Sequence, residues 1–320
     1  CFAKCTHSFN LNGMKSTQIF LTFIIIALGY FAQAQTYSDT TWERWYGETN
    51  RHDNPWHYQH AVHYDNGLLL LTYPDQNPYA TLLQKTDANG YLLWIKYFNA
   101  SFQFAFSTLA TTIAGEMYLG GAYMTTSGFE NPLIVKLNVC GEIEWCKKLE
   151  FSNYSFISDI AIDQQGDVIV SIINNDIVQE ERCIVGKFNS NGTLIWRYSI
   201  ASKSVHPLIH AAYLFGITID SVNNYFLGGH CIWPDYNQVG NIVRWRSLVV
   251  KVNENGKEEW LLPFGVDNEI ASICYPKFTK TGENSFFAVG PELVSYQPLI
   301  FNFSSAGDVL YYINDTILQG

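Results

Sequence analysis

Short apolar runs and polar turn segments alternate along residues 60–98, and this alternation predicts β-strands. Residues 68–73 are continuously apolar, as in a strand that is buried on both faces. The Asn66-Gly67 pair before them is typical of a tight hairpin turn, and residues 87–90 form a second turn segment. We therefore predict four antiparallel strands in this stretch, at residues 60–64, 68–73, 81–85 and 92–98.

A ten-residue pattern closes this unit and recurs along the chain. It begins with Lys, carries Gly at its sixth position and ends with Trp at residues 85–94, 136–145, 187–196 and 251–260, with a degenerate copy at 302–311. The closing aromatic residues lie at 94, 145, 196, 260 and 311, so the intervals are 51, 51, 64 and 51 residues. A period near 50 residues with four strands per repeat is typical of a β-propeller, in which each repeat forms one blade. We predict an all-β protein with five four-stranded antiparallel blades.

The repeated residues have structural roles in this prediction. Each glycine supplies the positive φ of a tight turn, and an Asp or Asn three residues earlier bonds its own backbone to fix that turn. We expect the tryptophans to be mostly buried between adjacent blades, and the lysine stems to follow the sheet while their amines reach water. The residues concerned are Gly90, Gly141, Gly192, Gly256 and Gly307; Asp87, Asn138, Asn189 and Asn253; Trp94, Trp145, Trp196 and Trp260; and Lys85, Lys136, Lys187 and Lys251.

Residues 42–47 resemble the fourth strands of the repeats, because Trp42 lies 52 residues before Trp94. The fifth blade already has its own fourth strand, so residues 42–47 form an orphan N-terminal strand. We expect this strand to complete a further blade whose first three strands lie beyond Gly320. The prediction is a propeller of five blades plus one strand, truncated from six or more blades.

The N-terminal residues indicate export. Residues 14–34 resemble a signal peptide, with Lys15, an apolar stretch at 19–28 and the small-residue site Ala32-Gln33-Ala34. Residues 1–13 precede a plausible start at Met14 and are interpreted as a non-native upstream segment. Residues 35–320 then form the propeller domain, with no membrane insertion after cleavage and a secreted or cell-surface location.

Charge and cysteine content narrow the partners and the redox chemistry. Without residues 1–34 the chain loses Lys4 and Lys15 and no acids, so its balance is 17 − 29 = −12, which argues against binding to nucleic acid. Five cysteines remain. About 20 Å of extended chain separates Cys140 from Cys146, far more than the ~4.4–6.8 Å between the Cα atoms of a disulfide. We expect free, largely buried thiols at Cys140, Cys146, Cys183, Cys231 and Cys274.

The complete repeat has the pattern W-x-K/R-x-aromatic-G, then D-x-G before an apolar strand, then K-x-D-x-x-G-x-x-x-W. This pattern resembles the secreted repeat β-propellers of bacteria that export through a type IX secretion system, and the resemblance covers nearly all of residues 42–313. It implies the fold and an extracellular location, and members commonly end in a sorting domain. The Gly-x-x-x-Trp part is similar, more distantly, to quinoprotein-type propellers. This chain has no adjacent Cys-Cys pair and no Thr before the blade glycines, so we expect neither a quinone nor another cofactor.

Function on a repeat fold is expected where one copy departs from the others. The interval of 64 residues contains 13 more than the others, between residues 227–229 and 248–251. This insertion joins the second and third strands of its blade and is rich in the residue types that dominate binding sites. A second departure, residues 52–63, holds half of the eight histidines. The candidate ligand-binding residues are Trp233, Asp235, Tyr236, Arg244 and Trp245 in the insertion and His52, Trp56 and His57 in the histidine-rich segment.

A metal site and a catalytic site are both weakly supported. Along a strand, His57 and His63 share one face while His60 points to the other, which disfavours a zinc site. Residues 163–167 resemble a calcium loop but occupy the position of the first hairpin turn.

The leading hypothesis is an exported, non-enzymatic propeller that binds a glycan or a protein. The alternatives are a polysaccharide hydrolase or lyase with carboxylates at the mouth of the central channel, and a purely structural surface module.

Overall fold

The computed structural model describes residues 59–72, 81–98, 104–125, 128, 130–151, 154–174, 181–201, 211–235, 242–264, 277–280, 282, 284–291 and 298–314. These residues form strands and turns and include no helix, so none of them belongs to a helix able to cross a membrane. The chain divides into two compact units, residues 1–46 and residues 47–320. All described residues belong to the second unit, and both the predicted signal peptide and the predicted strand at 42–47 lie outside the described residues.

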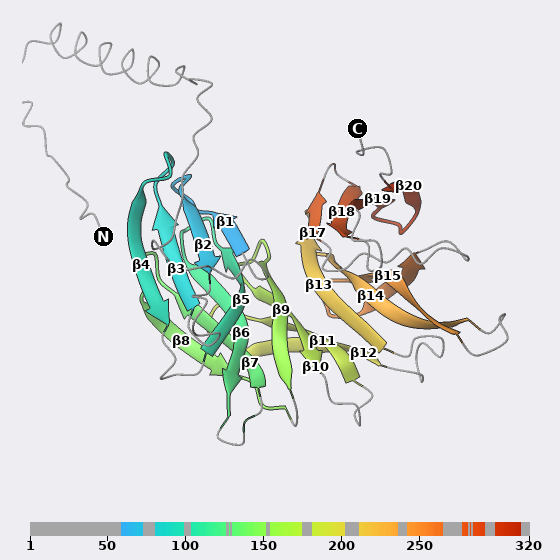
Figure 1. The fold of residues 1–320 in the computed structure, drawn as a ribbon, viewed down its shortest axis with the longest axis horizontal. Coiled ribbons are helices and arrows are strands. Elements are labelled where there is room, and N and C mark those ends of the chain that lie inside the picture. Colours follow the sequence, from blue (N-terminus) through green and yellow to red (C-terminus); the bar gives the residue numbers. More distant parts are fainter. Residues whose placement is uncertain are drawn as a thin grey trace, which may run out of the picture. The chain divides into compact units, whose positions relative to one another are not determined.

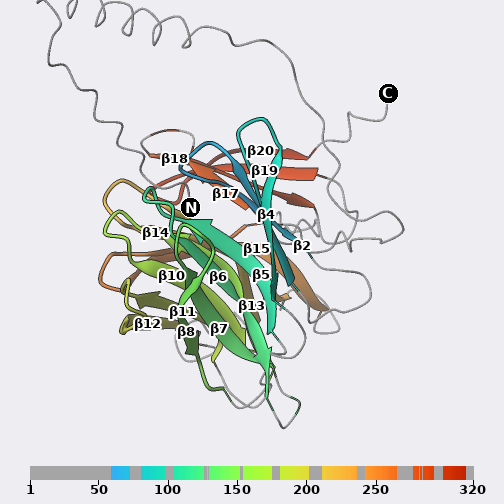
Figure 2. The same ribbon diagram turned by 90° about the vertical axis from the view of Figure 1, so that its left-hand side faces the viewer.

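The described strands form five antiparallel four-stranded sheets, which confirms the predicted all-β architecture with its repeated blades (Figures 1 and 2). Each sheet contains four strands in chain order, and we number these blades 1 to 5 along the chain. Blade 1 contains β1 (Gln59–Val62), β2 (Leu68–Thr72), β3 (Thr81–Thr86) and β4 (Leu92–Phe98). Blade 2 contains β5 (Phe104–Thr111), β6 (Met117–Met124), β7 (Glu130–Leu137) and β8 (Ile143–Lys148). Blade 3 contains β9 (Ser155–Ile162), β10 (Val168–Asn174), β11 (Glu181–Phe188) and β12 (Leu194–Ala201). Blade 4 contains β13 (Ala211–Ile219), β14 (Tyr225–Asp235), β15 (Ile242–Val252) and β16 (Glu258–Phe264). Blade 5 contains β17 (Lys277–Lys280), β18 (Ser285–Pro291), β19 (Pro298–Ser304) and β20 (Val309–Asn314).

The turn between the third and fourth strands has the predicted Asp or Asn bonds in blades 1 to 4 and the predicted glycine with positive φ in all five blades. In blade 3, Asn189 Oδ1 accepts from the backbone N–H groups of Asn191 and Thr193 at 3.0 and 2.9 Å. Gly192 follows with a φ of 76°, a conformation that other residues adopt only with strain. Asp87, Asn138 and Asn253 repeat these side-chain bonds, and the other four turn glycines also have positive φ.

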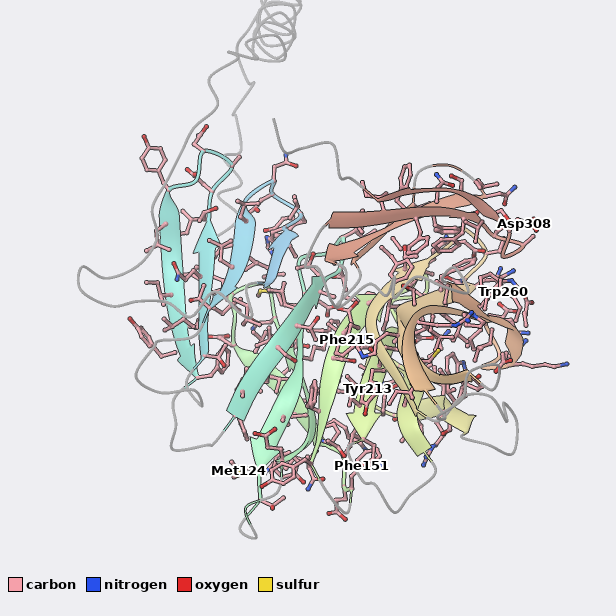
Figure 3. The ribbon with its side chains drawn as sticks, turned by 45° about the vertical axis from the view of Figure 1, so that its right-hand side comes forward. Met124, Phe151, Tyr213, Phe215, Trp260 and Asp308 are labelled. Atoms are coloured by element: carbon pink, nitrogen blue, oxygen red, sulfur yellow. The ribbon has the colours of Figure 1, made fainter. Side chains whose placement is uncertain are left out.

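Each closing tryptophan docks on the turn of the following blade. The indole Nε1 of Trp196 donates to the carbonyl oxygen of Glu254 at 2.9 Å, and a Cβ built on Gly256 would lie 2.6 Å from the indole ring. Trp145 and Trp260 donate in the same way to Ser190 and Ser305, and Figure 3 shows Trp260 beside the blade 5 turn that carries Asp308. We call this tryptophan–turn contact the seam between two blades.

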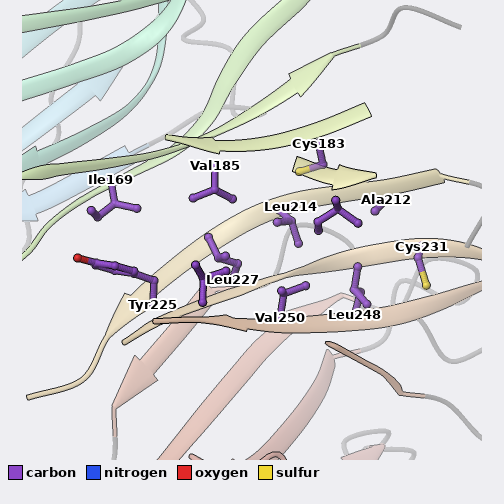
Figure 4. Close-up of a cluster of buried hydrophobic side chains, with 12 residues drawn as sticks. Ile169, Cys183, Val185, Ala212, Leu214, Tyr225, Leu227, Cys231, Leu248 and Val250 are labelled. Atoms are coloured by element: carbon purple, nitrogen blue, oxygen red, sulfur yellow. The ribbon is translucent and has the colours of Figure 1, made fainter. Parts of the chain in front are cut away.

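The seam tryptophans pack against the core clusters and leave only the smaller part of their surface exposed, which confirms the prediction that they are mostly buried. They occupy equivalent positions, as expected, but they lie on the fourth strand, which is the outer edge of each sheet. One ring face therefore packs on the next blade while the rest of the indole remains near solvent. The fully buried side chains lie on the first three strands of the blades, as in the cluster between blades 3 and 4 (Figure 4).

The repeated lysines do not extend into water as predicted, because carboxylates meet them inside the structure. Lys85, Lys136 and Lys187 are buried, and Lys251 is largely covered. Lys187 Nζ lies 2.8 Å from Asp163 Oδ2 and 3.2 Å from Asp167 Oδ2, both in the first hairpin turn of its blade. Equivalent ion pairs join Lys85 to Asp65, Lys136 to Glu116 and Glu144, and Lys251 to Glu259.

The first strands of blades 2, 3 and 4, which we call the inner strands, each contain a β-bulge at the same position. Hydrogen bonds at these bulges join neighbouring blades. The bulge residue Ser107 donates to the Ile157 carbonyl at 2.6 Å, and the bulge residue Ser158 donates to the Leu214 carbonyl at 2.6 Å. Beside them, Asp159 accepts from Thr108 Oγ1 at 2.9 Å and from the Ile217 backbone N–H at 2.8 Å. One buried carboxylate thus connects three blades.

The cysteines differ in part from the prediction. Cys183 and Cys231 are free and buried, as expected, and Cys146 is free but exposed. Cys140 takes part in a disulfide, so the prediction that it is a free thiol was wrong. The separation along the chain argued only against Cys146 as its partner, and Cys274 lies outside the described residues.

Candidate functional site

Blade 4 contains the longest hairpin of the described residues. Its strands β14 and β15 have 11 residues each and pair without a break from Tyr225↔Val252 to Asp235↔Ile242. In blade 2 the equivalent hairpin ends at Met124, four residues after Gly120, whereas Asp235 lies seven residues after the corresponding Gly228. Between the paired residues Phe226 and Lys251 this hairpin contains seven residues more than the blade 2 hairpin between Tyr118 and Lys136. It therefore holds seven of the 13 extra residues, while the other six precede Phe226, so the prediction that the whole insertion lies between the second and third strands was wrong in part. The two strands are longer by about 10 Å, at ~3.3 Å per residue.

The outer part of this hairpin is a two-stranded ribbon. We define the β14–β15 ribbon as residues 231–235 and 242–246, which pair with each other from Cys231↔Arg246 to Asp235↔Ile242. Within the described pairing, β13 reaches only to Ile232 and β16 only to Ser247. Because the four strands alternate in direction, the ribbon extends from the end of the sheet at which β13 begins and β16 ends. The connections between consecutive blades leave the sheets at this same end, because each runs from the end of a fourth strand to the start of the next first strand.

The structure brings four of the predicted site residues together in the ribbon backbone. Trp233 pairs directly with Arg244, Ile232 with Trp245, and Asp235 with Ile242. The other predicted positions, Tyr236, His52, Trp56 and His57, lie outside the described residues, as do the side chains of the ribbon residues 233–235 and 242–245.

An aromatic cluster that the sequence did not reveal lies at the base of the ribbon. His230, on β14, has ring centroids of Tyr213 and Phe215 at 5.3 and 5.4 Å, and both aromatic residues lie along β13 (Figure 3). Burial lowers the pKa of His230 to about 4, so the imidazole is neutral at physiological pH. The cluster is a rigid, uncharged support beneath the ribbon.

Two departures from the repeat could have identified this cluster. Leu227-Gly228-Gly229 is followed by His230, whereas the matching Leu-Gly-Gly of blade 2 is followed by Ala122. The bulge residue is Phe215 in blade 4, where blades 2 and 3 have Ser107 and Ser158. Neither change interrupts the apolar pattern of a strand, so the periodicity gave no signal.

The first residues of the ribbon connect it to the core. Cys231 is fully buried in the cluster between blades 3 and 4, and burial raises the pKa of its thiol to about 12, against a lowering influence of the Arg246 guanidinium. Arg246 is half-buried and pairs with Cys231 across the ladder. The ribbon is therefore fixed at its base by a packed, unreactive thiol.

In the histidine-rich segment 52–63, the structure describes the side chain of His63, which has a structural role. His63 is buried, with Nε2 at 3.0 Å from the Gly115 carbonyl oxygen and Nδ1 at 3.2 Å from Asp65 Oδ1. These contacts join the first hairpin turns of blades 1 and 2. Among the described residues there is no group of three His, Cys, Asp or Glu side chains that could hold a metal ion.

The loop at 163–167 is a hairpin turn whose carboxylates contact the amine of Lys187. Asp163 Oδ1 accepts from the backbone N–H groups of Gln165 and Asp167, both at 2.9 Å, while its Oδ2 accepts from Lys187 and Tyr225. Because the lysine amine already neutralises these carboxylates, the loop has no open oxygen cage for calcium.

Comparisons with known proteins support the fold and leave the function open. No known protein family and no curated protein matches the sequence. A Bacteroides caccae protein of unknown function matches the structure with a TM-score of 0.52 and 13% identity, over 88% of this chain and 87% of that chain. A Dyadobacter fermentans protein of unknown function matches with a TM-score of 0.51 and 8% identity, over 79% of this chain and 73% of that chain. At these identities the likeness concerns the β-propeller-like fold alone.

Proposed function

We propose that this protein is an exported, non-enzymatic β-propeller that binds a glycan or a protein ligand through the β14–β15 ribbon. The observation that carries the proposal is the ribbon itself, a regular extension of one blade in an otherwise uniform repeat. Binding residues on repeat folds concentrate at such departures, on elements held by a rigid scaffold. Two tryptophans and two arginines in ten residues match the composition of binding hot spots.

Export is the second part of the proposal. The apolar stretch at 19–28 and the Ala32-Gln33-Ala34 site support a signal peptide. The repeat pattern supports membership of the secreted bacterial propellers that use a type IX secretion system. A secreted or cell-surface location suits a binding module, because its ligands are then extracellular polymers or surface proteins.

Three buried or largely buried carboxylates of blade 3 are engaged by the scaffold and not open to a substrate. A hydrolase needs two carboxyl groups that are open to the substrate. Asp159, on an inner strand, is bonded through both oxygens to neighbouring blades, and Asp163 and Asp167 share the Lys187 amine. These acids serve the scaffold.

Paired variants of the full-length mature protein test the proposal. Trp233→Ala combined with Tyr236→Ala should abolish binding on a glycan array or in a surface-protein capture assay while leaving the melting temperature nearly unchanged. Tyr91→Ala combined with Tyr97→Ala is the matched control, since both tyrosines are exposed, Tyr91 directly before β4 and Tyr97 on β4 of blade 1. Retained binding in the ribbon variant contradicts the proposal, and release of oligosaccharides by the wild type would favour the hydrolase.

A further inference from the structure

The pairing of the β14–β15 ribbon separates its residues into two faces. Residues that pair directly across a ladder share a face, and successive residues alternate between faces. Trp233 pairs with Arg244 and Cys231 with Arg246, so these four positions belong to one face, together with Asp235. Ile232 pairs with Trp245 and Pro234 with Val243, and these four positions belong to the other face.

The first face concentrates positive charge in an acidic protein. The chain has six arginines in all and a net charge of −10, yet two of the arginines occupy alternate positions on one strand of the ribbon. Arg246 belongs to the packed base, so Arg244 and Asp235 are the charged positions of the outer part of this face, beside Trp233. The opposite face contains no charged position, which leaves the Trp233 face as the polar one.

We propose that the Trp233 face of the ribbon binds an acidic polysaccharide, with Trp233 as the platform for a sugar ring and Arg244 as the partner of its carboxylate or sulfate group. This inference rests on the proposed function and specifies its ligand. A guanidinium presents two parallel N–H donors that match the two oxygens of such a group, which a lysine amine does not. Because the protein as a whole is acidic and repels polyanions, binding of this kind depends on the local pairing of Arg244 with single acidic groups and not on a broad basic surface.

The position of the arginines supports different roles for the two residues. Arg246 is half-buried next to Cys231 at the base of the ribbon. Arg244 lies two residues further out, where β15 pairs only with β14 among the described strands. Arg244 is therefore the better residue for a binding test, because its replacement leaves the packed base intact.

The test measures the affinity of the full-length mature protein for polygalacturonate, dextran sulfate and neutral dextran. The wild type should bind the anionic polymers and not dextran, and the affinity should fall with added salt. Arg244→Gln should weaken this binding by about tenfold or more, with Arg244→Lys intermediate because it keeps the charge and loses the paired donors. Arg197→Gln, which removes an exposed arginine from β12 in blade 3, is the matched control and should leave the affinity unchanged.

The outcomes separate this inference from the proposed function. Equal binding of dextran and polygalacturonate, with Arg244→Gln behaving as the wild type, overturns the acidic ligand even if Trp233→Ala still abolishes binding. An equal loss in Arg197→Gln also overturns it, because the binding would then be a general charge effect. If the protein captures an acidic protein and has no affinity for either anionic polysaccharide, the proposed polysaccharide ligand is also overturned. If Trp233→Ala changes no binding at all, the proposed function itself fails. If the Arg244→Gln variant does not fold, the affinity of the Arg244→Lys variant for the anionic polymers is compared with that of the wild type instead.

Discussion

Lys187, at the start of the repeat pattern in blade 3, shows how a single residue connects two segments of one blade to the next blade. Lys187 reaches from the third strand to Asp163 and Asp167 in the first hairpin turn, and Tyr225 of the next blade closes the network at 3.1 Å. Burial acts to lower the pKa of Lys187, but hydrogen bonds to Asp163, Tyr225 and Asp167 hold it above its usual value. The amine is therefore charged throughout the physiological range.

Removing this cation should be costly. Lys187→Met leaves the fully buried Asp163 side chain without its counter-charge, and breaking a buried pair in this way costs about 3–5 kcal/mol in the free energy of unfolding. Adding Asp163→Asn should recover part of the loss. Urea denaturation measures both effects, with the exposed Lys147→Met as control. A change below that of the control would contradict a structural role for the pair.

His230 should make the stability depend on pH. Its pKa falls from 6.5 to about 4 in the folded protein because burial disfavours the imidazolium. Protonation therefore favours the unfolded chain, so the contribution of His230 is complete above pH 6.5 and is lost as the pH falls from 6.5 towards 4. His230→Gln should remove this dependence. Denaturant titrations of both proteins across that range should show their stability difference shrinking as the pH falls. A constant difference would exclude the effect.

The seam is the recurring unit at the scale of the element. It joins the fourth strand of one blade to the turn of the next through an indole, a carbonyl oxygen and a glycine. The glycine has two independent reasons to be there, its positive φ and the ring that lies against it. A pair of glycines in this protein separates these reasons.

Gly256→Ala should cost more stability than Gly166→Ala. Both glycines have a φ near 80°, so each substitution carries a backbone penalty of about 1 kcal/mol. A Cβ at position 256 also meets the Trp196 ring at 2.6 Å, whereas at position 166 nothing lies within 4 Å. We expect an additional ~1–3 kcal/mol from overpacking at the seam, measured by chemical denaturation. Equal losses would show that the indole yields without cost.

The seams also show what sequence reasoning could and could not reach. Turn glycines, their Asp or Asn partners and the strand order followed from local chemistry that each repeat encodes by itself. The burial of the tryptophans between blades followed as well, but the enclosure of Lys187 by carboxylates did not, because it depends on which atoms of another segment lie alongside. In the same way the insertion was found as an interval of 64 residues, but its regular pairing was not. The His230 cluster was missed because His and Phe at those positions leave the strand pattern intact.

At the scale of the whole molecule, coupling between blades runs through the inner strands as well as the seams. Each seam joins two neighbours, but Asp159 joins blades 2, 3 and 4 through one carboxylate. In a repeat protein, stability is approximately the sum of such neighbour terms, so a residue that serves two interfaces has a wider effect than one that serves a single interface.

Asp159→Ala should loosen three blades together. Native-state hydrogen exchange should show lower protection in β5, β9 and β13, because the Thr108 hydroxyl and the Ile217 N–H both lose their acceptor. Thr108→Val is the control, since it removes only one of the two bonds and should affect β5 and β9 alone. Loss of protection confined to β9 in the Asp159 variant would contradict the proposed coupling.

The seam has a consequence for how such a chain can evolve. Both halves of the contact, the glycine turn that receives an indole and the indole that docks onward, lie within one ten-residue segment. A duplicated repeat of 51 residues would therefore carry both the turn that receives the preceding tryptophan and the tryptophan that contacts the following turn. Tandem duplication and loss can change the number of blades by whole units without redesigning an interface. The β14–β15 ribbon lies outside the ten-residue segment that forms the seams. One repeat can therefore diverge in the ribbon and acquire its own specificity, while the other repeats keep the common pattern.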